Sequence, residues 1–143
     1  MKRLLFTLAT CCVMCACEQK TEMNPFFTEF QTEYGAPDFT KIRLEHYEPA
    51  FLKGIEEQNA EIKAIVDNPE EPTFENTIVA LDKSGGILAR VSGVFFALTE
   101  ADTNDSLTAL NEKMAPVLSE HSDNIYLNQD LYKRDRKSTR LNS

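Results

Sequence analysis

Histidine and cysteine, two residue types that commonly bind metals, are scarce in this chain. Only two histidines occur in 143 residues, His46 and His121, and they lie 75 positions apart. All four cysteines lie within the first seventeen positions. The H-E-x-x-H signature, which places two zinc-binding histidines one helical turn apart with a glutamate base between them, is absent. The sequence therefore predicts no catalytic residue and no metal-binding residue in this chain.

Each histidine has a structural interpretation instead. His46 precedes Tyr47-Glu48-Pro49 and is expected to brace the N-terminus of a helix. His121 shares the apolar face of a later predicted helix and is expected to be packed or hydrogen-bonded there. The alternative is that one of them binds a metal, but neither has a histidine or cysteine at ligand spacing.

Two further patterns are incomplete as binding sites. Gly85-Gly86 is not followed by Lys-Ser or Lys-Thr, which excludes a phosphate-binding loop. Asp102, Asn104 and Asp105 are potential calcium ligands, but the glycine and the terminal glutamate of an EF-hand are missing at the required spacing. We therefore interpret the segment 102–105 as the cap of a helix.

The charge is strongly acidic and excludes one class of partner. The segment between Cys17 and Arg134 contains 22 acidic and 10 basic residues, a net charge of about −12. Nucleic-acid binding needs clustered lysine and arginine that neutralise phosphates. We therefore expect no nucleic-acid partner.

Residues 1–16 have the pattern of an export signal. Lys2 and Arg3 precede an apolar run of 11 residues (4–14), which is too short to cross a bilayer core of about 30 Å. Cys17 follows Ala16 and precedes a polar run, an arrangement that resembles the lipobox of bacterial lipoproteins. We predict that Cys17 is diacylated and anchors a periplasmic or outer-membrane-attached protein in the cell envelope. Ordinary signal-peptidase cleavage without an anchor is the alternative.

The last nine residues, 135–143, can be encoded by a common short-read sequencing adapter. We expect that this segment is an artefact and that the natural reading frame continues differently after Arg134. The alternative is a natural basic tail.

No segment alternates apolar and polar residues as a half-buried strand does, so we expect an all-α fold of antiparallel helical hairpins. A first helix is predicted from about His46 to Asp67, with Pro49 in its first turn, where the missing N–H costs little. Thr73 is the predicted N-cap of a second helical segment. The apolar stripe of that segment begins at Phe74 and continues to about Leu98.

Ser84-Gly85-Gly86 interrupts the second segment. Glycine inside a helix costs about 1 kcal/mol relative to alanine, so we expect close packing of another backbone there, with a hinge as the alternative. A third helix follows the 102–105 cap, and Asn128 is expected to cap a fourth. The third helix has an apolar face formed by Leu107, Leu110, Met114, Val117, Leu118 and His121.

An aromatic arm precedes the helices. Residues 17–45 form the predicted arm, in which Pro25, Pro37 and Gly35 prevent a regular period. We expect extended chain and short turns that pack four aromatic side chains against another part of the protein. These side chains are Phe26, Phe27, Phe30 and Tyr34.

Several stretches resemble bacterial peptidyl-dipeptidases (dipeptidyl carboxypeptidases) of the thimet-oligopeptidase-like zinc peptidase family. The similarity covers residues 23–134 and is densest in N-P-E-E-P-T-F-E-N-T-I-V-A-L, at positions 68–81. It continues through R-V-S-G-V-F-F-A-L at 90–98 and D-N-I-Y-L-N at 123–128.

The resemblance implies that residues 46–134 form part of the N-terminal lobe of a two-lobed helical metallopeptidase, walling a channel that admits short peptides. It also implies a zinc ion in a missing C-terminal catalytic domain and release of C-terminal dipeptides. No family catalytic residue has a counterpart in this chain, so we expect the chain alone to bind no zinc and to be inactive. The rival interpretation is a free-standing, non-catalytic helical lipoprotein that binds or scaffolds.

Overall fold

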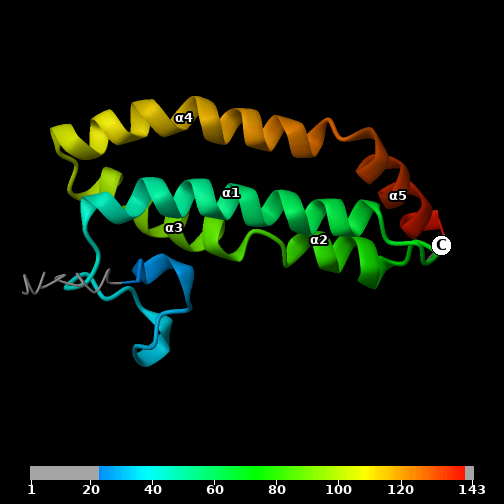
Figure 1. Ribbon diagram of the computed structural model, residues 1–143, viewed down its shortest axis with the longest axis horizontal. Helices are drawn as coiled ribbons and strands as arrows, with labels where there is room; N and C mark the ends of the chain where they lie inside the picture. The colour runs from blue at the N-terminus through cyan, green and yellow to red at the C-terminus, as the bar shows by residue number, and fades with distance from the viewer. Residues whose placement is uncertain (1–22, 141–143) are drawn as a thin grey trace, which may run out of the picture.

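The computed structural model describes residues 23–140, and every regular element in that range is helical (Figure 1). The predicted all-α class is confirmed. The predicted signal peptide, the lipid site at Cys17 and residues 141–143 lie outside the described residues. None of the helices in the described range is both long and apolar enough to cross a membrane. The elements are η1 (Pro25–Phe27), η2 (Glu33–Gly35), α1 (Leu44–Val66), η3 (Phe74–Val79), α2 (Ala80–Asp82), α3 (Gly86–Ala101), α4 (Asp105–Tyr126) and α5 (Gln129–Arg140).

Helix α1 begins two residues before its predicted start. The Nδ1 atom of His46 accepts a hydrogen bond from the backbone N–H of Arg43 at 3.1 Å, which satisfies a group just outside the first turn. The prediction that His46 braces a helix N-terminus is confirmed. Because the helix starts at Leu44, Pro49 lies in its second turn, and its predicted place in the first turn is wrong.

The second helical segment starts as predicted but does not continue as a regular α-helix. Thr73 caps it, because its hydroxyl accepts the Asn76 N–H at 3.1 Å. Residues 74–79 then form a π-helix, whose wider hydrogen-bonding step changes which side chains face inward. Thr77 is fully buried while Phe74 is half exposed. The expected apolar stripe is therefore wrong at Phe74.

The break at 84–86 has a different cause from the one predicted. Gly85 has a φ of +76°, a left-handed conformation that ends one helical segment and precedes α3. A Cβ on Gly85 would meet the Gln58 side chain at 2.6 Å, and one on Gly86 would meet nothing within 4 Å. The prediction of close backbone packing here is wrong. Such packing occurs instead at Gly54, where a Cβ would lie 2.7 Å from the Leu88 backbone nitrogen.

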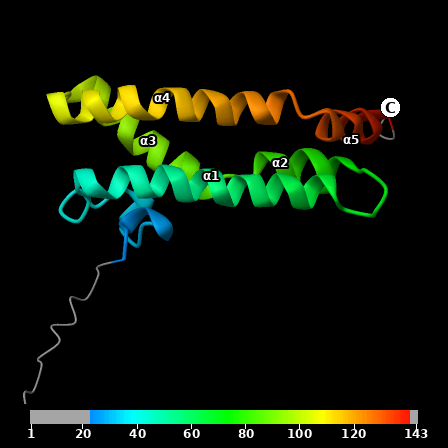
Figure 2. The same cartoon turned by 45° about the horizontal axis from the view of Figure 1, so that its top comes forward.

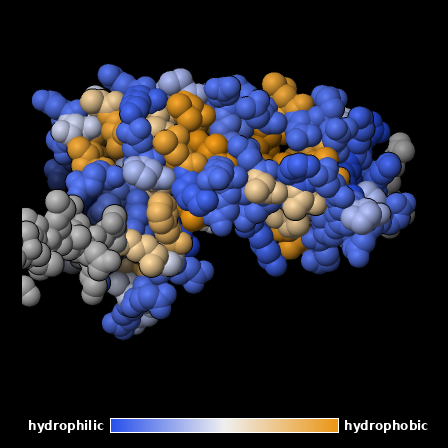
Figure 3. Space-filling model, viewed as in Figure 1, coloured by the Kyte–Doolittle hydropathy of each residue, from blue (hydrophilic) through white to orange (hydrophobic). Residues whose placement is uncertain are grey.

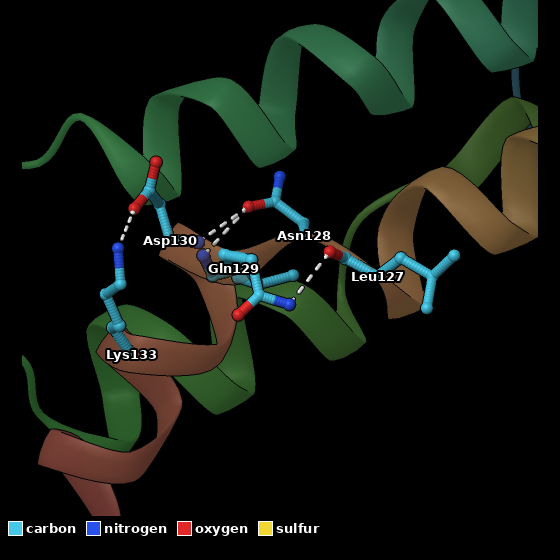
Figure 4. Close-up of polar contacts among 6 residues, drawn as sticks. Leu127, Asn128, Gln129, Asp130 and Lys133 are labelled. Carbon is cyan, nitrogen blue, oxygen red and sulfur yellow. Dashed lines mark hydrogen bonds and ion pairs between the residues drawn. The ribbon is translucent and has the colours of Figure 1, made fainter.

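The last two helices have the predicted caps. The side-chain oxygen of Asn104 accepts the N–H groups of Ser106 and Leu107, both at 3.1 Å, so the cap interpretation of 102–105 is confirmed. Asn128 does the same for Asp130 and Leu131, at 3.1 and 3.0 Å (Figure 4). These caps fix the start of α4 and the sharp change of direction into α5.

The long helices form an up-down-up arrangement with two separate apolar cores. The α2–α3 segment runs antiparallel to α1, α4 returns in the direction of α1, and α5 covers the far end of α1 and η3 (Figures 1 and 2). The first cluster consists of Phe26, Tyr47, Ala50, Phe51, Val91, Val94, Phe95, Leu107 and Met114. The second cluster, toward α5, consists of Ile62, Ile65 and Leu131, with Val66, Ala80, Leu81 and Ile125 packed against it.

The aromatic arm is only partly packed. Phe26 is fully buried and contacts Tyr47 at a ring-centroid distance of 5.2 Å, and Phe30 packs against the first cluster. The Arg90 guanidinium donates to the Phe26 carbonyl at 2.7 Å and ties the arm to α3. Phe27 and Tyr34 are exposed, Tyr34 at 96%, so the expectation that they pack is wrong within the described residues.

Candidate functional site

A layer of polar side chains separates the two apolar clusters at mid-length of the bundle. His121 of α4 contacts Gln58 of α1, with 2.7 Å between Nε2 and Oε1. The Gln58 amide donates to the Ser84 hydroxyl at 3.2 Å, and that hydroxyl donates to the Leu81 carbonyl at 2.7 Å. This direction makes Gln58 Oε1 an acceptor and His121 Nε2 the donor. Side chains from α1, α4 and the α2–α3 break thus meet in one connected set.

A second bond in the same layer holds the start of α3. The carboxylate of Glu61, one turn along α1 from Gln58, accepts the backbone N–H of Gly85 at 2.7 Å. An N–H group just before a helix has no partner within that helix, and a negative charge near this end is favourable. Gln58 and Glu61 together therefore fix α3 against α1.

His121 is almost fully buried, as the predicted packed or hydrogen-bonded role requires. Burial lowers the pKa of its imidazole below the ordinary value of 6.5, because a charged ring loses solvation there. The ring is therefore neutral at neutral pH, in agreement with its donor role to Gln58. The interpretation of His121 as a packed, hydrogen-bonded histidine is confirmed.

The described residues do not fit a zinc site. Within residues 23–140 no group of three or more histidine, cysteine, aspartate or glutamate side chains is placed to hold a metal ion. His46 uses Nδ1 to cap α1, and His121 uses Nε2 in the polar layer.

The polar layer lies beside an open hollow between α3 and α4. Its volume is about 430 Å³, and none of its ten lining residues is charged. The hydroxyls of Ser92 and Ser122 form no hydrogen bond with any other residue of the described segment. The lining residues are Gln58, Leu81, Leu88, Ser92, Phe96, Leu118, His121, Ser122, Ile125 and Tyr126. We call this surface the α3–α4 groove.

A second hollow, of about 670 Å³, lies between the first halves of α1 and α4. Apolar side chains gather between these helices among hydrophilic neighbours, as Figure 3 shows. Lys113 of α4 forms an ion pair with Glu48 of α1 at 2.6 Å, and both line the hollow. This second hollow is therefore bridged by the chain's own charged side chains, unlike the α3–α4 groove.

Arg134 closes the far end of the molecule. Its guanidinium donates to the carbonyl oxygens of Asn68 and Glu70 at 2.7 and 3.2 Å, and to the Asn76 side chain at 3.4 Å. Asn76 in turn accepts the Thr73 N–H at 2.8 Å and donates to the Glu71 carbonyl at 3.0 Å. The polar groups of the N-P-E-E-P-T-F-E-N stretch thus form the surface against which α5 is held.

Comparison with known proteins identifies relatives for this helical segment. Dipeptidyl carboxypeptidase of Escherichia coli (strain K12) is 48% identical over 114 residues, which make up 80% of this chain and 17% of that protein. The dipeptidyl carboxypeptidase of Salmonella typhimurium (strain LT2) is 45% identical over 111 residues, 78% of the chain and 16% of that protein. The chain is homologous to dipeptidyl carboxypeptidases.

The resemblance predicted from the sequence is therefore confirmed, and a more distant relative extends it. Oligopeptidase A of Escherichia coli (strain K12) is 28% identical over 113 residues, 79% of the chain and 16% of that protein. No protein-family model matches the chain. The chain spans about one sixth of the length of the dipeptidyl carboxypeptidases that it matches.

Sequence reasoning missed most of the polar layer and the contacts of Arg134 with the 68–76 stretch. Gln58 could have been found, because it lies 7 positions after Phe51 and 4 before Ile62, on the apolar face of α1. Glu61 and Ser84 carry no such periodic signal. Arg134 binds backbone carbonyls 64 and 66 positions away, which no local pattern reveals.

Proposed function

We propose that this chain is a segment of an exported zinc peptidase that releases dipeptides from the C-termini of short peptides. The observation that carries the proposal is the 48% identity over 114 residues to a dipeptidyl carboxypeptidase. Identity at this level extends over four fifths of the chain and agrees with the resemblance in its N-P-E-E-P-T-F-E-N stretch.

The segment's part in the proposed enzyme is structural: it walls the channel through which peptides reach the catalytic centre. Two features support this role. Helices α1 and α4 are long, with 23 and 22 residues, and the polar layer fixes them against α3. The described residues also lack a metal-binding cluster, so they suit a wall better than a reaction centre.

The zinc and the catalytic glutamate belong, in this proposal, to a C-terminal catalytic domain outside the chain. Zinc in such a site lowers the pKa of a bound water to about 7 and polarises the peptide carbonyl. The substrates are short peptides, and Cys17 anchors the protein in the cell envelope as a periplasmic or outer-membrane lipoprotein. Products formed from a peptide with a blocked C-terminus would show that the enzyme also cleaves internal bonds.

The test begins with genomic sequence across the codon for Arg134. We expect an open reading frame that continues and encodes H-E-x-x-H on a predicted helix far downstream. The full-length protein should bind one zinc ion, release dipeptides from an N-acetylated peptide and lose that activity to a chelator. The 143-residue chain should hold no stoichiometric zinc after equilibrium dialysis.

Three results would contradict the proposal in different ways. A complete gene without H-E-x-x-H would remove the peptidase assignment. A gene that stops near Arg134 would favour the free-standing helical lipoprotein that binds or scaffolds. Tight one-to-one zinc binding by the 143-residue chain would refute the assignment of zinc to the missing domain.

A further inference from the structure

The α3–α4 groove differs in charge from the rest of this surface. Charged residues make up 27% of the chain, and its net charge is −8. None of the groove's ten lining residues carries a charge. The second hollow, by contrast, is lined by Glu45, Glu48 and Lys113. An uncharged apolar hollow on an acidic protein is the kind of surface that another apolar surface covers.

The groove also presents groups that have no partner within the described chain. Phe96 is 40% exposed and Tyr126 is 83% exposed, and both line the groove. The hydroxyls of Ser92 and Ser122 form no hydrogen bond with any residue between 23 and 140. A covering element would therefore bury aromatic surface and could hydrogen-bond to two hydroxyls at once.

The shape of the groove favours a helix as the covering element. Its walls are α3 and α4, which run antiparallel (Figure 2). Gln58 of α1 and its hydrogen-bond partner His121 also line the groove. A channel between two helices accepts the apolar face of a third, whose side chains recur every three to four residues.

We infer that the α3–α4 groove is the docking surface for an apolar helix of the remaining polypeptide of the full-length protein. This inference rests on the proposed function, because it needs a longer chain. The length of the relatives supports that occupant: the chain matches only 16–17% of each dipeptidyl carboxypeptidase. The docked helix has an uncharged face and joins this segment to the rest of the enzyme.

Cysteine labelling of the full-length protein tests the inference. Ser122→Cys places a thiol in the groove, and Ser119→Cys places one on the exposed side of the same helix, outside the groove lining. Mass spectrometry of the peptide that contains each position follows its reaction with a maleimide, so the native cysteines do not interfere. Serine to cysteine is a small change, and circular dichroism verifies that both variants keep the helical content of the wild type.

In the 143-residue chain both thiols should react, the partly buried one at position 122 more slowly than the exposed one at position 119. In the full-length protein the thiol at position 122 should react at least about tenfold more slowly than the same thiol in the 143-residue chain, because a covered site reacts only when it opens. Equal reactivity of the two thiols in the full-length protein would overturn the inference. Protection of position 122 in the 143-residue chain that grows with its concentration would assign the groove to a second copy and also overturn it.

The labelling result is independent of catalysis. Zinc content and dipeptide release are measured on the same full-length preparations. Protection at position 122 in a protein without peptidase activity would support the docking surface while refuting the proposed function. Equal labelling of the two positions in an active peptidase would refute the docking surface while supporting the proposed function. A gene that encodes no further polypeptide would overturn both.

Discussion

Gln58 occupies a position where the helical period of α1 calls for an apolar side chain, and a partly buried amide there needs partners. His121 and Ser84 supply them, at 2.7 and 3.2 Å. The cost of partly desolvating the amide is therefore offset by hydrogen bonds to two other segments. At the residue scale, the polar layer is a set of mutually dependent side chains, and the removal of one leaves the others unsatisfied.

The buried His121 should make stability depend on pH. Its pKa is lowered by burial in the folded state, while the unfolded ring keeps the ordinary value of about 6.5. Below that value the unfolded chain takes up the proton first, so stability falls as the pH falls. We expect the urea midpoint of the wild type to drop between pH 7.5 and about pH 5.5, in the range where an ordinary histidine titrates.

The His121→Gln variant is the comparison for this prediction. It cannot titrate in this range, so its midpoint should drop less over the same pH interval. An identical drop in both proteins would show that other groups cause the pH dependence.

Gly54 should be the glycine that tolerates a side chain least. A Cβ there would lie 2.7 Å from the backbone nitrogen of Leu88 and 2.9 Å from its Cα, atoms that cannot move aside cheaply. We expect Gly54→Ala to lower the free energy of unfolding by about 1–3 kcal/mol, the usual cost of overpacking. Urea denaturation followed by circular dichroism measures the change.

Gly93→Ala is the matched control, because a Cβ at that position meets nothing within 4 Å. Alanine is the better helix former, so this variant should be unchanged or more stable by up to about 1 kcal/mol. If Gly54→Ala were as stable as Gly93→Ala, the close contact between α1 and α3 would not exist in solution.

At the scale of whole elements, the helix starts were predictable where the capping residue lies next to the helix in the sequence. Thr73, Asn104 and Asn128 each cap the helix that their sequence neighbourhood indicates. The π-helix at 74–79 was not predictable, because its apolar residues have the same spacing as those of an α-helix. Only the burial of Thr77 in place of Phe74 reveals the different hydrogen-bonding step.

Arg134 should contribute strongly to the position of helix α5, beside the buried Leu131. Arg134 is 8% exposed and donates to two carbonyls of the 68–70 turn. Replacing it by methionine keeps the length of the side chain but leaves those carbonyls without their donor. We expect Arg134→Met to destabilise the protein by about 2 kcal/mol, in the range of hydrogen bonds to charged groups. Amide hydrogen exchange should become faster in α5 than in α1.

Lys133→Met provides the control in the same helix. Lys133 is exposed, and its one ion pair within residues 23–140 is with Asp130, at 2.8 Å in the first turn (Figure 4). Such a surface pair contributes at most about 0.5 kcal/mol. Equal exchange rates in α5 for the two variants would contradict the role given to Arg134.

At the scale of the whole molecule, the pairing of distant segments was beyond sequence reasoning. The polar layer joins positions that are 24, 26 and 63 residues apart, and each partner is an ordinary surface residue type. The all-α class and the homology were predictable, because helical periods and the long N-P-E-E-P-T-F-E-N-T-I-V-A-L stretch are local signals. The α3–α4 groove appears only once the helices are packed.

The proposed membrane attachment should depend on one residue. Two acyl chains anchor a protein stably, whereas a single chain binds only marginally. We expect the wild-type protein to fractionate with membranes through Cys17, to resist high salt and to be released by detergent. Cys17→Ser should be soluble or remain unprocessed. Cys15→Ser, two positions upstream, should behave as the wild type, and membrane retention of Cys17→Ser would rule out the anchor.

The polar layer has a further consequence for how the helices are aligned along their axes. Apolar cores tolerate sliding, because one leucine can replace another after a shift of one turn, about 5.4 Å. Gln58, Glu61 and His121 do not permit such a shift, since each would lose its hydrogen-bond partners in a buried or partly buried position. A single buried polar position sets the register of a coiled coil in the same way. The layer therefore selects one axial alignment of α1, α3 and α4 among several that hydrophobic burial alone would allow.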